Sequence, residues 1–426
     1  MRTVVIWIFV AASCVLAGLA RASGPPPLEL SALLDEADRA SPELLAVRAR
    51  ADASANVAPQ RAALPDPRLS ASYTNDGLSG FTLGDSEFTN LTVGWEQEVP
   101  ARSVRRSAAT VADAQAEAAR ASGVTAAAAL HARVVTLYVE LWRLDHTKAL
   151  LMESRQLLTT AAQAAQARYE SGEGIQEGVI RAQTSTRRVE LELLELALAR
   201  RNAEIALGAA LGREDDPEFG ETGELPELAG SIDAQGLATS ATSASPEILE
   251  AAARERTASV QLDDARLQVK PVFSWLAAYQ FRGGLDPMVM GGFSVRLPVW
   301  KDRKQERAIA AASFESTAAG RDREAAVVRA RAGVRGLAAD VASIDARMRL
   351  YAEAIIPQTL TAYESANAAF SSGRAEMFLV LDDLDRWVGV RREALELSAR
   401  RIETIASLES ITGTTLLRVP GPGRSQ

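Results

Sequence analysis

The chain has 426 residues, a formal net charge of -8, two histidines and one cysteine. An acidic chain of this kind lacks the basic surface that binds nucleic acid, and one cysteine cannot form an internal disulfide. Its hydrophobic share of 47% is near the average for folded proteins.

The first 22 residues have the pattern of a secretory signal peptide. Arg2 precedes an apolar run at residues 4–19, which is short for a bilayer span and ends in the small-x-small sequence of residues 20–22. We expect cleavage near Ser23, which removes Cys14 and leaves a mature chain without a thiol. Lipidation of Cys14 is an alternative, although apolar sequence continues beyond it. No second run of about 18 apolar residues follows, so any membrane crossing by the mature chain is expected to use strands.

Four landmarks recur in the same order at an offset of roughly 200 residues, which is the pattern of an internal repeat. They are Ser41-Pro42-Glu43 with Ser245-Pro246-Glu247, Val99-Pro100 with Leu297-Pro298, Tyr169-Glu170-Ser171-Gly172 with Phe370-Ser371-Ser372-Gly373, and Leu211-Gly212 with Thr412-Gly413. The chain is therefore predicted to contain two copies of one unit. We expect these units at residues 23–212 and 245–413, with an acidic linker at 213–244 and a tail at 414–426.

Each unit is predicted to consist mainly of long helices. Residues 102–170 lack proline, are rich in alanine, and alternate charged with aliphatic residues at helical spacing. Such a helix would be about 100 Å long. The shorter helices expected at residues 30–63 and 175–211 would together line its whole side. The counterpart in the second unit, residues 302–372, contains Pro357, which should kink or locally break it.

Between the helices, apolar and polar residues alternate with a period of two over segments of roughly ten residues. Four such segments are predicted to be strands, near residues 69–74, 90–99, 273–281 and 289–297. A lipid-facing surface is expected to carry the apolar set, with aromatic rings near the bilayer interfaces. That set includes Val93, Trp95, Trp275, Tyr279 and Phe293, together with Tyr73. A half-buried sheet of a soluble protein would show the same alternation, so the strands alone leave both interpretations open.

Four strands cannot close a membrane barrel, because closure needs at least about eight. The barrel must therefore be shared between chains. A dimer would give a barrel too tight for a channel, whereas a homotrimer would give twelve strands. The predicted fold class is mainly α with a membrane β-barrel of twelve strands.

This organisation resembles the TolC family of outer-membrane efflux proteins over nearly all of the mature sequence. The likeness rests on the tandem unit, on Arg168-Tyr169-x-x-Gly172 leading to Ala182-Gln183, and on Phe370-x-x-Gly373 leading to Val380-Leu381-Asp382. The sequence ALPDPRL at residues 63–69 is similar to the branch that exports heavy-metal cations. Gly178 and Leu379 depart from the family pattern, since they stand where relatives often carry an acidic residue.

The resemblance implies a passive exit duct in the outer membrane of a Gram-negative cell, in which the twelve strands stand on an α-helical periplasmic barrel, the long periplasmic extension. A periplasmic adaptor and an inner-membrane pump would be its partners, and metal cations or small molecules its cargo. The turns that meet the adaptor are expected at Gly172, Glu173 and Gly174 and at Gly373, Arg374 and Ala375. The closed periplasmic entrance is expected at Asp382, with Arg386 and Arg181 available to hold its carboxylate.

Other functions fit less well. His131 and His146 are about 22 Å apart along one helix, so they cannot bind one metal ion within a subunit. No phosphate-binding loop and no nucleophile in a catalytic setting is evident, and we expect no enzymatic activity, cofactor or metal site. Two alternatives to an efflux duct stay open: a channel for type I protein secretion, which uses the same family, and a periplasmic coiled-coil scaffold, which would fractionate as a soluble protein.

Overall fold

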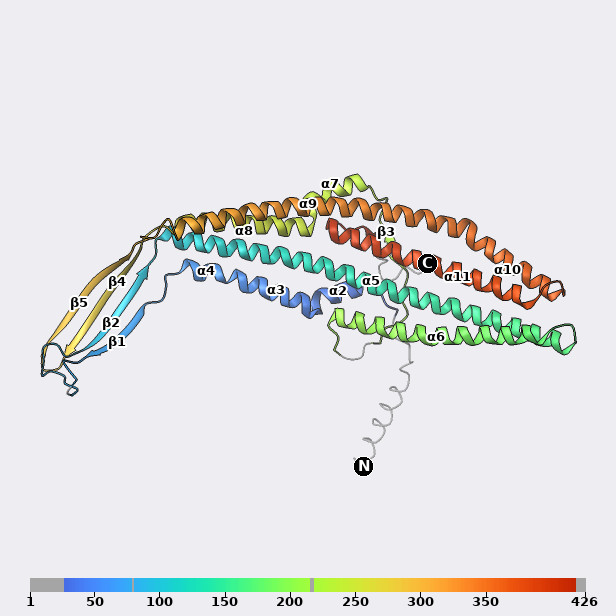
Figure 1. Ribbon diagram of the computed structural model, residues 1–426, viewed down its shortest axis with the longest axis horizontal. Coiled ribbons are helices and arrows are strands. Elements are labelled where there is room, and N and C mark those ends of the chain that lie inside the picture. Colours follow the sequence, from blue (N-terminus) through green and yellow to red (C-terminus); the bar gives the residue numbers. More distant parts are fainter. Residues whose placement is uncertain (1–26, 79, 215–217, 419–426) are drawn as a thin grey trace, which may run out of the picture.

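A computed structural model describes residues 27–78, 80–214 and 218–418 of the chain. The predicted signal peptide with Cys14, and the end of the predicted tail, lie outside the described residues. Figure 1 shows an elongated molecule with a sheet at one end and helices running from it to two helical turns at the other end.

The first half of the chain follows the predicted helix pattern closely. Its helices are α2 (Leu30–Ala40), α3 (Pro42–Ala55), α4 (Val57–Ala62), α5 (Arg102–Glu170) and α6 (Gln176–Leu211). The helix α5 has 69 residues and is therefore about 100 Å long. Helices α3, α4 and α6 all pack along α5, so the short helices do line the long one.

The second half has the same order of helices. They are α7 (Ala234–Ala244), α8 (Pro246–Leu267), α9 (Gln305–Leu350), the π-helical turn η2 (Tyr351–Ile355), α10 (Ile356–Ser371) and α11 (Met377–Thr412). The predicted interruption near Pro357 is confirmed, because the single π turn lies directly before the helix that begins with Ile356-Pro357. Proline lacks the amide hydrogen that would continue the helical ladder, and a π turn relieves that break.

The four predicted strands form one antiparallel sheet in the order β1-β2-β4-β5. The strands are β1 (Arg68–Thr74), β2 (Asn90–Val99), β4 (Val272–Arg282) and β5 (Leu285–Arg296). The hairpin β1–β2 comes from the first half of the chain and β4–β5 from the second, and β2 pairs with β4. Within the described structure, the outer edges of β1 and β5 have no strand partner.

The buried core lies along the seams between helices. The largest cluster joins α2, α5, α6 and α11 around Tyr138, Leu141 and Leu207, which are almost fully buried. Two smaller clusters continue towards the helical turns, one around Leu158 and Trp387 and one that joins α5, α6, α10 and α11. The core is thus a long strip, and no thick centre forms.

By length and mean hydropathy alone, α5 is apolar enough to cross a membrane. The sequence had been expected to hold no such stretch after the signal peptide. Only a third of the apolar window is buried in the chain, yet α5 packs against α3, α6, α8 and α11 and therefore forms the centre of the helical body. The apolar and alanine residues of α5 serve these helix contacts.

The segment predicted as an acidic linker contains ordered structure. It includes α7 and the short strand β3 (Glu227–Leu228), which pairs with β6 (Leu417–Arg418) near the C-terminus. Phe219 in this segment is buried. Its acidic residues Glu214, Glu218, Glu221 and Glu224 are exposed, and Asp215 and Asp216 lie outside the described residues.

Two sequence landmarks meet in space in each half of the chain. Gly212 ends α6 with φ of +79°, and a Cβ atom there would lie 2.6 Å from Cδ of Pro42. Gly413 ends α11 with φ of +67°, and a Cβ atom there would overlap the carbonyl oxygen of Ala244 and lie 3.2 Å from Cδ of Pro246. In both halves, a glycine is required by its left-handed backbone and by the close approach of the Ser-Pro turn.

Candidate functional site: sheet face, helical tips and entrance cleft

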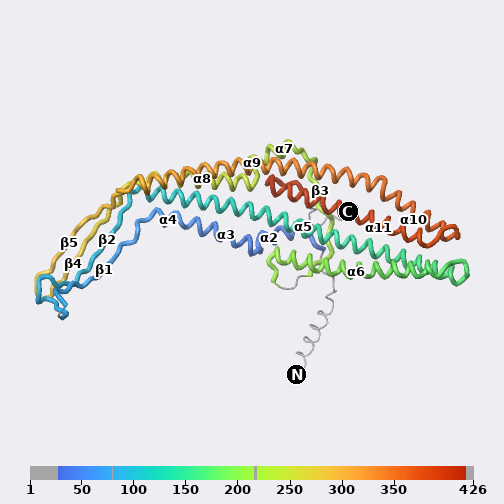
Figure 2. The backbone as a smooth tube through the Cα atoms, viewed as in Figure 1, coloured from blue at the N-terminus to red at the C-terminus, as the bar shows by residue number. Residues whose placement is uncertain are grey.

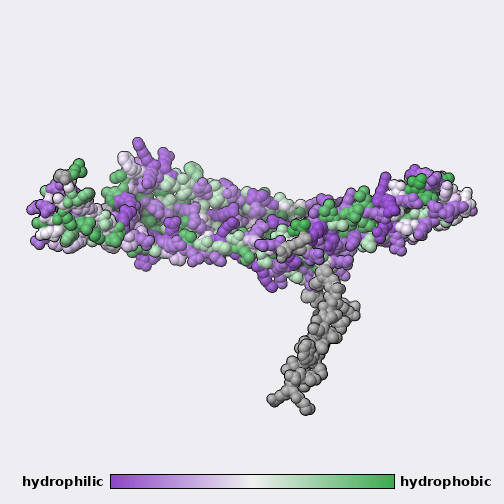
Figure 3. Space-filling view, turned by 90° about the horizontal axis from the view of Figure 1, so that it is seen from below, coloured by the Kyte–Doolittle hydropathy of each residue, from purple (hydrophilic) through white to green (hydrophobic). Residues whose placement is uncertain are grey.

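The register of the sheet puts the predicted apolar set on one face. Val93 lies opposite Tyr279, and Trp275 lies opposite both Gln97 and Phe293. Directly opposite residues of antiparallel strands point to the same side. The apolar side chains are also exposed: Trp275 is 57% and Phe293 is 73% accessible. Figure 3 shows hydrophobic residues gathered over the sheet, whereas hydrophilic residues dominate the middle of the helical body.

The opposite face carries mainly small and polar side chains. Thr92 lies opposite Ser72 and Gln280, and Ser274 lies opposite Ser294. Gly94 leaves room for Ser70, whose Oγ lies 2.9 Å from the place a Cβ atom would take. In a soluble protein, the apolar face of such a sheet is buried against the core and the polar face is exposed to water. Here the apolar, aromatic face is the exposed one.

At the far end of the molecule, the two predicted tips are left-handed glycine turns. Gly172 has φ of +76° and Gly373 has φ of +73°. The amides of Glu173 and Gly174 both donate to the carbonyl oxygen of Arg168 at 2.9 Å, which closes the end of α5. The helices α6, α5, α11 and α10 lie beside one another here (Figure 2).

Arg168 joins the two tips. Its Nη1 donates to the carbonyl oxygen of Phe370 at 2.6 Å, and its guanidinium lies 5.0 Å from the centre of the Phe370 ring. A Cβ atom on Gly373 would lie 3.2 Å from Nη2 of the same arginine. The glycine therefore gives the guanidinium access to the second tip. A cavity of about 320 Å³ lies between the tips and is lined by Glu173, Gly174, Arg374 and Ala375, among others.

Two of the three predicted entrance residues, Arg181 and Asp382, line a cleft of about 500 Å³ between α6 and α11. Nη2 of Arg386 lies 3.0 Å from Oδ2 of Asp382, and Nη1 lies 3.3 Å from Oδ1 of the buried Asp383. Arg386 is thus in contact with Asp382 within this chain, and the role of the pair at an entrance stays a prediction. Both residues belong to α11, so the contact forms within one helix.

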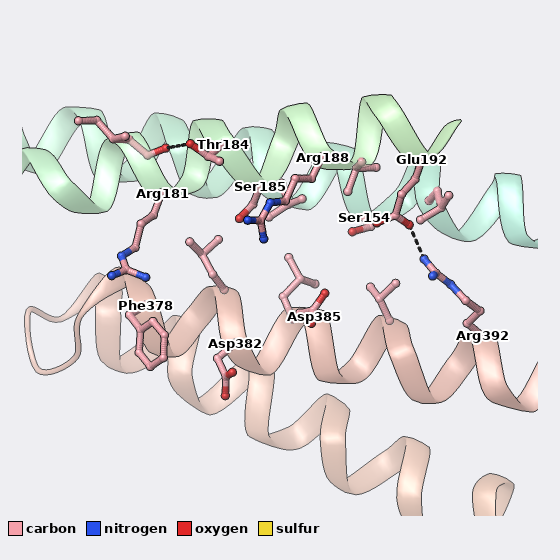
Figure 4. Close-up of a pocket in the computed structure, with 17 residues that line it drawn as sticks. Ser154, Arg181, Thr184, Ser185, Arg188, Glu192, Phe378, Asp382, Asp385 and Arg392 are labelled. Carbon is pink, nitrogen blue, oxygen red and sulfur yellow. Dashed lines mark hydrogen bonds and ion pairs between the residues drawn. The ribbon is translucent and has the colours of Figure 1, made fainter. Parts of the chain in front are cut away.

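Arg181 is not a partner of Asp382 in this chain, contrary to expectation. It forms an ion pair with Glu177 on its own helix and lies 5.4 Å from the centre of the Phe378 ring. Figure 4 shows Asp382 pointing away from α6, while the arginine reaches towards Phe378. Glu177 is four positions from Arg181 on the same helix and therefore lies within reach of its guanidinium. A contact with Asp382 across the cleft would depend on the direction of both side chains.

Helix packing explains why a glycine occupies position 178. It is buried where α6 crosses α11, and a Cβ atom there would lie 3.1 Å from Cβ of Met377. A carboxylate at this position would lose its hydration inside the helix contact. The departure from the family pattern therefore lies at a close crossing of the two helices beside the tips.

The two histidines have separate surroundings. Nε2 of His131 lies 3.1 Å from Oδ1 of Asp38, and the ring of His146 stacks on Trp142 with centres 4.2 Å apart. Across residues 27–78, 80–214 and 218–418, no group of three or more His, Cys, Asp or Glu side chains is placed to hold a metal ion.

A polar belt around the middle of the helical body was missed from the sequence. Asp145 of α5 accepts from Nε of Arg200 at 2.7 Å and from both N and Oγ1 of Thr222 at 3.2 Å. Nη2 of Arg200 also donates to the carbonyl oxygen of Gly220 at 3.1 Å. Burial raises the pKa of Tyr138 to about 12, so its hydroxyl stays protonated and donates to the carbonyl oxygen of Glu224 at 3.2 Å.

The C-terminal side of the belt is fixed by the half-buried carboxylate of Glu409. Oε1 of Glu409 accepts from the amides of Leu416 and Leu417, at 2.5 and 2.7 Å, which holds β6 against β3. Burial raises the pKa of Glu409, and the two amide donors oppose that shift. The only sequence sign of the belt was the spacing of charged residues on helices, which does not identify partners about 77 residues apart such as Asp145 and Thr222.

Comparisons with known proteins agree with this geometry. The model of the outer membrane efflux protein family matches residues 33–213. Among curated proteins, none matches the chain significantly. The solved outer membrane protein VceC of Vibrio cholerae is similar in fold, with a TM-score of 0.73 and 22% identity over 90% of this chain and 96% of that chain.

Two further solved channels have the same fold at lower identity. The Campylobacter jejuni CmeC outer membrane channel gives a TM-score of 0.75 with 13% identity, over 90% of this chain and 85% of that one. The open state of the Neisseria gonorrhoeae MtrE outer membrane channel gives 0.73 with 17% identity, over 92% and 90%. The likeness to these channels concerns the fold, including the sheet with an exposed apolar face. Residues 33–213 therefore resemble the outer membrane efflux protein family, and the fold over about nine tenths of the chain is that of solved outer-membrane channels.

Proposed function

We propose that three copies of this chain form a passive efflux duct, with a shared twelve-stranded barrel in the outer membrane and a helical tunnel in the periplasm. The observation that carries this proposal is the open four-stranded sheet with an exposed apolar face. Its edge strands β1 and β5 leave backbone donors and acceptors without a strand partner. In a bilayer these groups must be paired, and pairing β1 of one copy with β5 of the next satisfies them.

The helical body supports the same assembly. Helix α6 buries Val189, Ala203 and Leu207 within its own chain. It also exposes a second apolar seam, made of Ile180, Leu191, Leu194 and Leu198, which are 53 to 70% accessible. Spacings of three and four residues within Leu191, Leu194 and Leu198 are those of a helix that packs against another helix.

The complementary surface lies at the other end of the row of helices. Helix α10 exposes the small side chains Thr361, Ser365 and Ala368 on one side. Large side chains of one helix fit between small ones of the next, so α6 of one subunit would pack against α10 of another. Because these two surfaces differ, the contact is head-to-tail, and a threefold rotation would close it.

The two halves of the chain are proposed to be copies of one unit. The matched order of helices, the tip glycines Gly172 and Gly373, and the cap glycines Gly212 and Gly413 support this proposal. A pseudo-sixfold tunnel would follow, in which each subunit supplies two similar helical hairpins.

An adaptor protein in the periplasm is the proposed partner at the tips, with an inner-membrane pump as the source of energy. The cargo is proposed to be metal cations or small molecules, since residues 63–69 resemble the cation-exporting branch. The tip residues Glu173 and Arg374 are exposed and free to meet a partner. A cysteine at either position should crosslink to an adaptor in cells, whereas absence of any adduct with normal assembly would overturn the adaptor contact.

The assembly is tested with cysteine pairs, because Cys14 is the only cysteine and is predicted to be removed with the signal peptide. Leu194→Cys combined with Thr361→Cys should give chains linked into dimers and trimers in outer-membrane fractions. The matched control pairs Glu195→Cys with Glu364→Cys, which lie on the same helices but beside the seam. Equal linking by both pairs would overturn the interface. Recovery of the wild-type chain with soluble periplasmic proteins would favour a scaffold and overturn the duct.

A further inference from the structure

The passage from β5 to α9 differs from its counterpart in the first half of the chain. Only Ala101 separates Pro100 from α5, whereas residues 299–304 separate Pro298 from α9. These added residues read Val-Trp-Lys-Asp-Arg-Lys. The second passage therefore places an aromatic ring and three cations where the sheet meets the helices.

The passage is an ordered turn. The amides of Arg303 and Lys304 donate to the carbonyl oxygen of Trp300 at 3.2 and 2.9 Å, and the amide of Glu306 donates to that of Lys301 at 2.9 Å. The turn nevertheless leaves its apolar side chains in the open, because Val299 is 74% and Trp300 is 69% accessible. An ordered backbone that exposes a tryptophan is the geometry of a contact surface.

The exposed apolar residues extend the lipid-facing side of the sheet. Phe293 and Val295 belong to the apolar face, and Leu297 and Val299 continue the same alternation beyond the end of β5. Trp300 follows directly. The tryptophan thus lies at the border of the apolar band, on the side of the helices, which is where tryptophan is favoured in a membrane interface.

Cations without partners surround this border. Arg102, Arg106, Arg303, Lys304 and Arg307 are exposed and form no ion pair within the described part of the chain. They belong to the first turns of α5 and α9 and to the passage itself. The unpaired carboxylates in the passages between sheet and helices are Asp66 and Asp302, so positive charge predominates. In Figure 3, a group of hydrophilic residues projects where the sheet meets the helices.

The two halves are linked at this level by hydrogen bonds. Nζ of Lys270 donates to Oγ of Ser103 at 2.8 Å, and Nη1 of Arg105 donates to the carbonyl oxygen of Ala62 at 2.6 Å. These contacts occupy two further cations and link the start of α5 to the passages that follow α4 and α8. Arg102 and Arg106 therefore flank linked residues, and Arg303 and Lys304 belong to a hydrogen-bonded turn, which limits the entropy lost when a ligand binds.

We propose that this basic collar, defined as Arg102, Arg106, Trp300, Arg303, Lys304 and Arg307, binds the phosphate groups of anionic phospholipids. The collar faces the periplasmic leaflet, because it lies on the helical side of the sheet. This inference rests on the proposed function, since it requires the sheet to be in the membrane. Cations just outside an apolar band attract anionic headgroups, and the tryptophan ring occupies the interface between headgroup and acyl chain.

The collar is tested by native mass spectrometry of the purified trimer with equal amounts of dioleoyl-phosphatidylglycerol and dioleoyl-phosphatidylcholine. The wild type should retain phosphatidylglycerol in at least about threefold excess, whereas the variant Arg303→Gln, Lys304→Gln, Arg307→Gln should fall close to parity. The matched control is Arg331→Gln, Arg335→Gln, Arg347→Gln, which removes three exposed cations without ion pairs from the same helix α9, away from the sheet. This control should keep the excess.

A second measurement follows the fluorescence of Trp300. Bromine atoms quench tryptophan at short range, so brominated phosphatidylglycerol vesicles should quench the wild type more than the variant Trp300→Phe. Equal quenching of both proteins, or the same lipid preference in the collar and control variants, overturns the proposal. The proposal is also overturned if the collar variant loses binding of lipopolysaccharide and keeps binding of phosphatidylglycerol, because lipopolysaccharide belongs to the other leaflet.

The outcome separates this proposal from the proposed function. A wild-type chain that trimerises and conducts in planar bilayers, yet shows no preference for phosphatidylglycerol, overturns only the collar. A chain that neither trimerises nor conducts overturns both.

Discussion

The sheet and the helical body place their apolar residues on opposite sides. Every residue of β1 is exposed, and the largest aromatic side chains of β4 and β5 point outward. In the helical body, Leu141, Leu207 and Val334 are fully buried and charged residues cover the outside. An apolar outer surface suits lipid and a charged outer surface suits water, so the two parts of the chain are suited to different surroundings. Under the proposed function, the boundary between the patterns, at the passages between strands and helices, would be the boundary between lipid and water.

The strongest way to break this comparison is a charge on the apolar face of the sheet. Val93→Lys or Phe293→Lys should abolish the heat-resistant trimer in outer-membrane fractions, because a lysine facing lipid near the bilayer midplane costs about 2–4 kcal/mol per subunit. Gel mobility of unheated and heated membrane samples measures the loss.

The matched controls are Thr92→Lys and Ser294→Lys. Each lies next to its test residue in the same strand and points to the polar face. These variants should assemble almost normally. Similar behaviour of both sets would remove the assignment of the outer face to lipid.

A smaller effect is expected at the glycine turns of the helical body. The loss of stability should be larger where less space is free around the added methyl group. Gly413→Ala and Gly212→Ala combine a left-handed backbone with steric overlap, and should lower stability by about 2 kcal/mol or more. Gly172→Ala has the same backbone strain, but nothing lies within 4 Å of its added methyl group, so about 1 kcal/mol is expected. Trimer dissociation temperature measures the order; a larger loss at Gly172 than at Gly413 would contradict the packing described here.

The contact between the tips gives a local effect. Arg168→Ala removes a charged donor from the carbonyl oxygen of Phe370, which costs about 1–3 kcal/mol and should loosen the second tip. Hydrogen exchange of residues 368–376 should rise at least about tenfold, with little change at the sheet. Arg155→Ala, an exposed arginine of the same helix, is the control. Unchanged exchange at the tip would show that the two turns are independent.

The sequence predicts elements with strong periodicity and misses contacts that depend on distant residues. The bounds of α5 follow from an unbroken alanine-rich segment, and the sheet face follows from alternation with a period of two. By contrast, α7 and β3 lie in a segment whose acidic composition masks Phe219 and Ala241, the buried residues that anchor it. Isolated hydrophobic residues in a polar segment form no periodic pattern, so the sequence does not indicate that they are buried.

The entrance shows the same limit at the level of single side chains. The sequence offered Arg386 and Arg181 as basic groups for Asp382, and in this chain Asp382 pairs with Arg386, four residues further along the same helix. Spacing could not place Arg181, because its choice between Glu177 and Asp382 depends on the rotation of α6 against α11. The close crossing at Gly178 fixes that rotation, and its tightness is a property of the pair of helices.

The smallest expected effect concerns the charge of the entrance. Three copies of Asp382 around a threefold axis would attract cations, so Asp382→Asn should lower cation selectivity in single-channel recordings. Since Arg386 lies 3.0 Å from this carboxylate and is shared with Asp383, part of the charge is already offset, and the change should be modest. Asp385→Asn should do less, although Asp385 lines the same cleft. Arg386→Gln frees Asp382 and should raise cation selectivity, which is opposite in sign to the effect of Asp382→Asn. If all three variants leave conductance, selectivity and block by divalent cations unchanged, this part of α11 does not line the pore.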